Sequence, residues 1–238
     1  MNISHTPYYH LVIDNFFENE LVEKIANDFI DYNDSRWFYY NNLIENKKTL
    51  NDWRFFPKYI YQAFNTFCSD EFVKNLQNIT GIEKLYPDYG LHGGGCHIHG
   101  RNGKLNVHKD YSLHPKLGLQ RKLNLIVYLS KDWDTSWGGG LELWSHDDTT
   151  NQPKEKVKEI ECVFNRAVIF DTTQNSWHGL PNELTCPENV YRKSLAMYYL
   201  TDPEIEVDTR ERALFAPSEY QKNDSDVKLL IEQRSKFI

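Results

Sequence analysis

The chain has 238 residues, of which 26% are charged and 14% aromatic, and its formal net charge is −7. This length suits one domain with a sizeable core, and the negative charge argues against a nucleic-acid binder that relies on a broad basic surface. No apolar run is long enough to cross a bilayer, so we expect no membrane association. The N-terminal sequence lacks a basic stretch followed by an apolar one, and the four cysteines lack C-x-x-C spacing, which together indicate a cytoplasmic protein with reduced thiols.

Residues 1–84 predict a helical layer laid on a sheet. Residues 8–13 read as a first strand, and the apolar residues that follow recur at four-residue spacing, as in a helix capped by Asp14 or Asn15. The sequence therefore predicts a strand–helix unit at the start of the chain.

The next stretch, residues 31–56, is polar and aromatic without a clean period. We expect a loop with short elements there, and its aromatic content suggests a lid over a pocket. A second helix is expected over residues 57–81, with a break near Ser69 and an end at Gly81, because glycine readily ends helices.

From residue 85 to residue 201 the pattern changes to short alternating segments separated by Gly, Asn, Asp and Pro, typical of a barrel or sandwich. The expected strands are 90–99, 104–110, 121–130, 139–145, 157–164, 166–172 and 190–201. Residues 146–156 are charged and predict a surface loop, and residues 202–238 predict an extension with a helix from about Ser225. The fold class is therefore mainly β with α, in a single domain over residues 1–238.

The most informative motif is His108-Lys109-Asp110, which lies in strand-like sequence. Residues i and i+2 of a strand share one face, so His108 and Asp110 aim an imidazole and a carboxylate at the same point. One His and one Asp supply two-thirds of the 2-His-1-carboxylate triad of non-haem Fe(II) oxygenases, and His178, after a later apolar strand, is the best candidate for the third ligand. The second such motif, at His146, follows a strand and lies in a polar run, so we interpret it as a solvated loop.

A carboxylate-binding fork is predicted on the last alternating strand. Arg192 and Ser194 share one face, and a buried guanidinium with a hydroxyl two residues away suits a carboxylate. Tyr128, on an apolar strand, could add a phenol to the same carboxylate, although a core tyrosine is equally compatible with its position.

In this order the residues resemble the iron- and 2-oxoglutarate-dependent dioxygenases, specifically the prolyl 4-hydroxylase-like branch. The resemblance rests on the H-x-D motif, a strand ending in Tyr128-Leu129 before Lys131-Asp132-Trp133, the run Gly139-Gly140-Leu141-Glu142-Leu143, His178, and Arg192-Lys193-Ser194. It covers roughly residues 90–201, and it implies a double-stranded β-helix (jelly-roll) core buttressed by N-terminal helices.

The resemblance also implies the chemistry of the site. His108, Asp110 and His178 would bind Fe(II), and Arg192, with Ser194 and Tyr128, would bind the distal carboxylate of 2-oxoglutarate. The expected reaction consumes 2-oxoglutarate and O2, releases succinate and carbon dioxide, and hydroxylates an unactivated C–H bond. Ascorbate is compatible as an auxiliary reductant. The carboxylate of Asp110 favours hydroxylation over the halogenation that related enzymes with a small residue there perform.

One departure from the family pattern concerns the cosubstrate. Many relatives carry a Tyr several residues before the H-x-D motif that contacts 2-oxoglutarate near the metal, whereas this chain has HIHGRNGKLNV, so His97, His99 or Asn106 is expected to replace it.

The sequence does not identify the substrate. A prolyl residue in a peptide is the first expectation, with a free amino acid or small metabolite as the alternative. A second class of function is a non-redox metal- or ligand-binding jelly roll, since jelly rolls host many functions. A zinc hydrolase would have no use for the Arg192 and Ser194 pair, and a nucleic-acid demethylase of the same superfamily would carry a second Arg further along that strand, where this chain reads AMYYL. Oligomeric state is not indicated.

Overall fold

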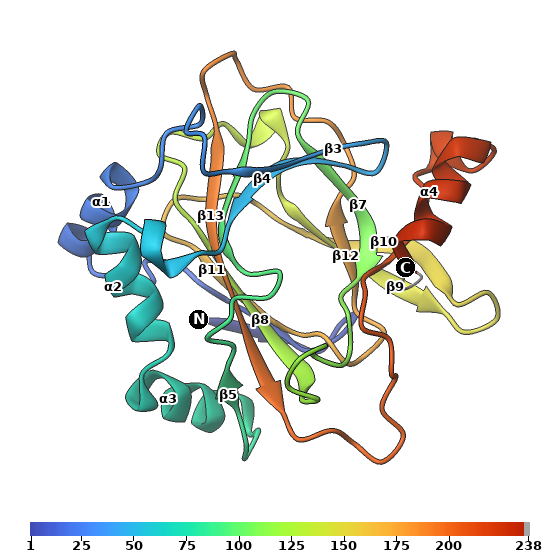
Figure 1. Ribbon diagram of the computed structural model, residues 1–238, viewed down its shortest axis with the longest axis horizontal. Coiled ribbons are helices and arrows are strands. Elements are labelled where there is room, and N and C mark those ends of the chain that lie inside the picture. Colours follow the sequence, from blue (N-terminus) through green and yellow to red (C-terminus); the bar gives the residue numbers. More distant parts are fainter. Residues whose placement is uncertain (236–238) are drawn as a thin grey trace.

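The computed structural model describes residues 1–235, and a curled antiparallel sheet is its central element (Figure 1). The strands are β1 (Asn2–Ser4), β2 (His10–Ile13), β3 (Phe38–Asn41), β4 (Glu45–Leu50), β5 (Tyr86–Pro87), β6 (Gly95–His99), β7 (Lys104–Lys109), β8 (Gln120–Tyr128), β9 (Leu141–Asp147), β10 (Gln152–Ile160), β11 (Ala167–Asp171), β12 (Trp177–Leu180), β13 (Arg192–Thr201) and β14 (Leu214–Phe215). Their spatial order is β1-β2-β11-β8-β13-β6-β4-β7-β12-β9-β10, while β14 pairs with β7, β3 with β4 and β5 with β13. The prediction of a mainly β protein with some helix is confirmed.

Three helices cover one side of this sheet, and a fourth lies on the opposite side (Figure 1). The α-helices are α1 (Asn19–Asn27), α2 (Lys58–Phe67), α3 (Asp70–Thr80) and α4 (Ser225–Ser235), and the short 3-10 helices are η1 (Trp53–Phe55), η2 (Thr135–Trp137) and η3 (Glu219–Gln221). In the described part of the chain, no helix combines the length and the apolar character that crossing a membrane requires.

Helix boundaries follow local capping chemistry where the sequence supplies it. The side chain of Ser69 accepts a hydrogen bond from the Phe72 N–H, which separates α2 from α3 and caps α3, and Gly81 ends α3 in the left-handed conformation at φ 72°. Both predictions for this helix pair are confirmed. The predicted cap of α1 at Asp14 or Asn15 is wrong, because α1 begins only after Glu18.

A side chain from a distant loop explains this late start of α1. The Asn165 side-chain oxygen accepts a hydrogen bond from the Phe17 N–H at 2.9 Å, and its amide nitrogen donates to the Phe17 carbonyl at 2.8 Å. The backbone before α1 is therefore bonded to another part of the molecule rather than to its own first helical turn.

Alternation along β8 and β13 divides the interior into a packed layer and a cavity. Leu123, Leu125 and Val127 of β8 belong to the large apolar cluster that the N-terminal helices complete, as do the corresponding residues of β13. The intervening residues Asn124 and Ile126 line the cavity inside the curled sheet. The helices thus fix the position of the two central strands, whose other face carries the site.

The surface loop predicted over residues 146–156 is wrong, and the loop predicted over residues 31–56 is confirmed only in its short elements. Residues 31–56 contain the hairpin β3–β4, and β4 pairs with both β6 and β7, so this stretch is part of the sheet. The hairpin is half-exposed on both faces, which removes the alternation that would have revealed it. Residues 146–156 are largely strand, since β9 runs to Asp147 and β10 begins at Gln152. The predicted C-terminal helix is confirmed at Ser225.

Candidate metal and cosubstrate site

A cavity of about 400 Å³ opens inside the curled sheet, and residues from β4, β6, β7, β8, β12, β13 and the C-terminal extension line it. It contains all three predicted metal ligands and both Arg192 and Ser194. The structure therefore brings together residues that the sequence spreads over almost ninety positions.

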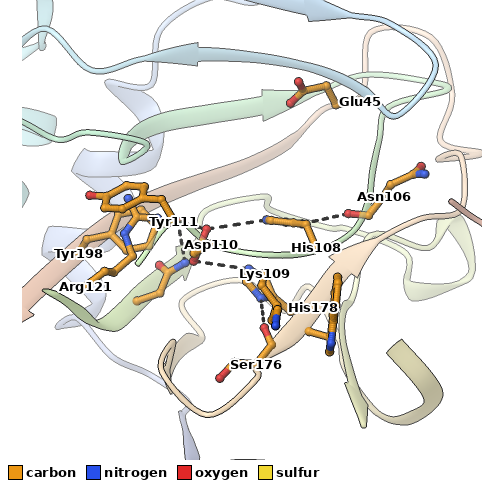
Figure 2. Close-up of polar contacts among 12 residues, drawn as sticks. Glu45, Asn106, His108, Lys109, Asp110, Tyr111, Arg121, Ser176, His178 and Tyr198 are labelled. Atoms are coloured by element: carbon orange, nitrogen blue, oxygen red, sulfur yellow. Dashed lines mark hydrogen bonds and ion pairs between the residues drawn. The ribbon is translucent and has the colours of Figure 1, made fainter. Parts of the chain in front are cut away.

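His108, Asp110 and His178 form a compact buried cluster, with one potential ligand atom of each within 4.8 Å of the others (Figure 2). His108 and His178 are direct partners across the antiparallel pair β7–β12, which brings their side chains together. Gly179 permits this close approach, because a Cβ there would lie 2.8 Å from the Leu105 carbonyl oxygen. The glycine after the third candidate ligand is therefore required by packing.

Backbone carbonyls fix the tautomer of both histidines. Nδ1 of His108 lies 2.9 Å from the Asn106 carbonyl, and Nδ1 of His178 lies 2.8 Å from the Ser176 carbonyl. A carbonyl only accepts, so Nδ1 carries the proton and Nε2 presents its lone pair to the centre of the cluster. Burial lowers the pKa of His178 and lowers that of His108 to about 3, so both rings are neutral and ready to bind a metal ion.

The carboxylate of Asp110 completes a donor set that fits a divalent metal. Its Oδ1 lies 3.8 Å from Nε2 of His108, and its Oδ2 lies 3.7 Å from Nε2 of His178. Oδ2 is buried and has no hydrogen-bond partner among the described residues, which is costly unless a cation occupies the centre. Two neutral imidazoles and one carboxylate on one side match the facial triad of non-haem Fe(II) sites.

Arg121, which the sequence analysis did not select, binds the other oxygen of this carboxylate. Its Nη1 lies 3.1 Å from Oδ1 of Asp110, and its guanidinium lies between the rings of Tyr111 and Tyr198, 3.3 and 3.4 Å from their centroids (Figure 2). Burial alone would raise the pKa of Asp110, but the charge of Arg121, together with smaller contributions from neighbouring groups, outweighs it and lowers that pKa. The ligand is therefore held ionised.

The C-terminal extension contacts the segment that carries His108 and Asp110. Phe215 pairs with His108 in the β14–β7 ladder, and its ring stacks on the imidazole with centroids 5.1 Å apart. The Nη1 of Arg210 donates to the Asp110 carbonyl at 2.6 Å. Asn106 donates to the carbonyl of Ala216 at 3.1 Å and to Gln221, so its side chain belongs to this outer contact and is not a cavity wall.

The predicted carboxylate fork lies in the same cavity. Arg192 is 3% exposed, and its Nε donates to the Gly139 carbonyl at 2.6 Å. A Cβ at Gly139 would lie 2.9 Å from the Arg192 side chain, which explains the glycine run before β9. Ser194 pairs with Tyr128 across β13–β8, but Tyr128 is not among the residues that line the cavity. Its buried ring packs against the apolar cluster that contains Leu141 and Phe170, and the Arg192 guanidinium lies 4.9 Å from the ring centroid. Arg192 and Ser194 of the predicted fork thus line the cavity where an anion can be bound.

Of the polar and aromatic residues near the H-x-D motif and the third candidate ligand, Tyr111 lines the cavity, whereas Arg101, Lys104, Trp137 and Trp177 do not. Arg101 donates to the Cys186 carbonyl, and Lys104 pairs with Glu183 on the surface. Trp177 is buried against Val107 and Ala216.

Three important residues were missed by sequence reasoning. Tyr198 follows Arg192, Ser194 and Ala196 at period two, so the strand pattern contained a signal for it. Arg121 and Phe215 depend on distant partners and gave no local signal.

The sequence of residues 94–200 matches the family model of the 2OG-Fe(II) oxygenase superfamily. A curated relative, prolyl 3-hydroxylase OGFOD1 of Mus musculus, is 26% identical over 201 residues, which are 81% of this chain and 33% of that protein. The chain spans about a third of the length of the curated relatives it matches.

Solved structures share the fold at low identity. A prolyl hydroxylase from Trichoplax adhaerens, in complex with a peptide fragment of hypoxia inducible factor, gives a TM-score of 0.58 at 16% identity and covers 80% of this chain and 83% of its own. HygX from Streptomyces hygroscopicus, with nickel, 2-oxoglutarate and hygromycin B bound, gives 0.52 at 15% identity, with 81% and 82% covered. The predicted jelly-roll core is confirmed by these matches.

Proposed function

The chain belongs to the 2OG-Fe(II) oxygenase superfamily, and on this premise we propose that it hydroxylates an unactivated C–H bond of a prolyl residue, with Fe(II) and 2-oxoglutarate. The observation that carries the proposal is the buried His108, Asp110 and His178 cluster, whose ligand atoms converge within 4.8 Å. A jelly roll without redox function would have no need for this cluster beside an anion-binding arginine.

Each residue of the site has a defined task in this proposal. His108, Asp110 and His178 would hold the metal on one face and leave the opposite positions open. Arg192 would pair with the distal carboxylate of 2-oxoglutarate, with Ser194 and Tyr128 beside it. When bound, iron and 2-oxoglutarate supply the oxidising chemistry, in which O2 and the keto acid become succinate, carbon dioxide and the hydroxyl oxygen of the product.

The protein itself supplies orientation and the walls of the cavity. The Nδ1 protons of both histidines remain on backbone carbonyls, which keeps Nε2 free, and Arg121 keeps the Asp110 carboxylate charged. The rings of Tyr111 and Tyr198 line the cavity next to this carboxylate and offer apolar walls for a substrate ring.

A prolyl substrate is supported by the curated relatives, which are named prolyl 3-hydroxylases, and by a structural neighbour that binds a peptide. The fold alone does not decide the substrate class, because HygX has the same fold and binds hygromycin B. A small-molecule substrate is therefore the alternative that the experiment must address.

The first test is anaerobic. Protein loaded with Fe(II) and then with 2-oxoglutarate should develop a weak metal-to-ligand charge-transfer band in the visible spectrum. The band should require His108 and weaken in Arg192→Ala, whereas His5→Ala, a substitution of an exposed histidine, should leave it unchanged. A folded, iron-loaded wild type without any band would overturn the cosubstrate assignment.

The second test concerns the substrate. Proline-containing peptides would be incubated with Fe(II), 2-oxoglutarate and O2, with succinate release and the mass gain of one oxygen atom as readouts. Acid hydrolysis and comparison with 3-hydroxyproline and 4-hydroxyproline standards would identify the carbon. Succinate release stimulated by free amino acids or metabolites, but by no peptide, would favour the alternative.

A further inference from the structure

His99, on β6, is a buried polar side chain without a partner. It is 2% exposed, it lines the cavity, and neither ring nitrogen has a hydrogen-bond partner among the described residues. Buried polar atoms are rarely left without hydrogen-bond partners. Two such nitrogens on the His99 ring therefore indicate that a bound ligand supplies the missing hydrogen bond. The cavity wall at His99 is therefore built to receive a polar group.

The register of the sheet places this ring next to the predicted anion site. His99 is the direct partner of Arg192 across the antiparallel pair β6–β13, and His97 is the partner of Ser194. Side chains of direct partners lie side by side on one face of the sheet. His99 thus lies on the same patch as the guanidinium that would bind the distal carboxylate.

The two histidines differ in what they can offer. A ring N–H of His97 donates to the Gly94 carbonyl, and its Nε2 is left without a partner, so its free nitrogen is an acceptor. Burial and the nearby Arg192 lower the pKa of His99, so its ring is neutral and keeps one free N–H in either tautomer. A carboxylate only accepts hydrogen bonds, and of the two rings only His99 can donate one.

We propose that His99 donates a hydrogen bond to the same carboxylate of 2-oxoglutarate that Arg192 binds. The assignment rests on the proposed function, and it differs from the family pattern, in which a tyrosine before the H-x-D motif contacts the cosubstrate near the metal, because His99 would bind the distal end. Of the three residues that the sequence offered in this region, Asn106 is bonded to Ala216 and Gln221 and His97 presents an acceptor, which leaves His99 as the donor.

Calorimetric binding of 2-oxoglutarate to the Ni(II)-loaded protein tests the proposal without turnover. A hydrogen bond to a charged group is worth enough that His99→Leu should weaken binding by about 10- to 100-fold. His99→Gln, which retains an N–H donor, should recover most of the affinity, and His97→Leu should bind within about threefold of wild type because the only N–H that it removes is already bonded to the Gly94 carbonyl. 2-Oxobutyrate, which lacks the distal carboxylate, should bind equally to wild type and His99→Leu.

A second readout avoids substitution altogether. In Zn(II)-loaded wild type with 15N-labelled histidine, addition of 2-oxoglutarate should shift the His99 ring resonances, and 2-oxobutyrate should not. Equal affinity of wild type and His99→Leu, an equal loss for both keto acids, or an unshifted His99 resonance at saturation would overturn the assignment. Loss of binding in Arg192→Ala with unchanged binding in His99→Leu would overturn His99 alone, whereas a wild type that binds no 2-oxoglutarate would overturn the proposed function and this assignment with it.

Discussion

Replacing Arg121 with leucine should destabilise the metal-free protein strongly. Arg121 is 2% exposed, and its charge is matched by Asp110 at 3.1 Å. It also donates to the His92 carbonyl at 2.6 Å and lies between two tyrosine rings. The substitution leaves the Asp110 carboxylate buried without its cationic partner.

The magnitude follows from the burial of this pair. Removing one partner of a buried ion pair costs about 3–5 kcal/mol, because the remaining charge is uncompensated. For a chain of this size each kcal/mol corresponds to about 2–4 °C, so Tm should fall by roughly 6–20 °C. The matched control is Arg166→Leu, whose partner Asp14 is 57% exposed, and such an exposed pair is worth about 1 kcal/mol or less.

Urea unfolding of the two metal-free variants, followed by far-UV circular dichroism, measures the difference. Saturating Zn(II) should recover part of the loss in Arg121→Leu, since a bound cation neutralises Asp110 in place of the guanidinium. If the free energies of unfolding of Arg121→Leu and Arg166→Leu agree within about 1 kcal/mol, the argument from buried charge is wrong.

Three further predictions concern the same site. Zn(II) at a hundredfold its Kd should add about 2.7 kcal/mol to the stability of wild type and much less to that of His178→Ala, as thermal unfolding with and without metal would show. Burial lowers the pKa of His97 to about 3, so the unfolded chain binds its proton below pH 6.5 while the folded one does not. The free energy of unfolding should therefore fall between pH 6.5 and pH 3 by about 1.4 kcal/mol per pH unit from His97, and His97→Leu should flatten that slope in urea titrations. Phe215→Ala should cost about 3–5 kcal/mol and weaken Zn(II) binding, because it removes the ring stacked on His108; unchanged metal affinity would contradict the second part.

Much of the core could be predicted because its signals are local. The period-two alternation of β8 and β13 identified two central strands, and Ser69 and Gly81 identified the helix boundaries through capping chemistry. The β3–β4 hairpin escaped prediction because it is half-exposed on both faces and so lacks an apolar stripe. The start of α1 escaped because Asn165, far along the chain, holds the backbone before it.

The residues of the site divide in the same way, into those with a local sequence signal and those without one. His108 and Asp110 are recognisable since a strand brings i and i+2 to one face, and Arg192 with Ser194 is recognisable for the same reason. Arg121 gave no signal, because its role arises from an ion pair with Asp110 and from two rings in separate elements. Contacts that depend on the closure of the curled sheet cannot be read from local pattern.

The proposed metal ligands contact more of the chain than the region that matches the superfamily. That region ends at residue 200, yet Arg210 holds the Asp110 carbonyl and Phe215 stacks on His108. The extension also lines the cavity through Arg234 of α4, which lies 2.7 Å from the buried carboxylate of Glu45 on β4. The residues proposed to bind iron and 2-oxoglutarate lie inside the matched region, whereas Arg234 and Glu45 lie outside it. We therefore expect substrate choice to depend on the β4 and C-terminal side of the cavity, and exchange of Arg234 or Glu45 to change which substrate is hydroxylated before it changes the binding of 2-oxoglutarate.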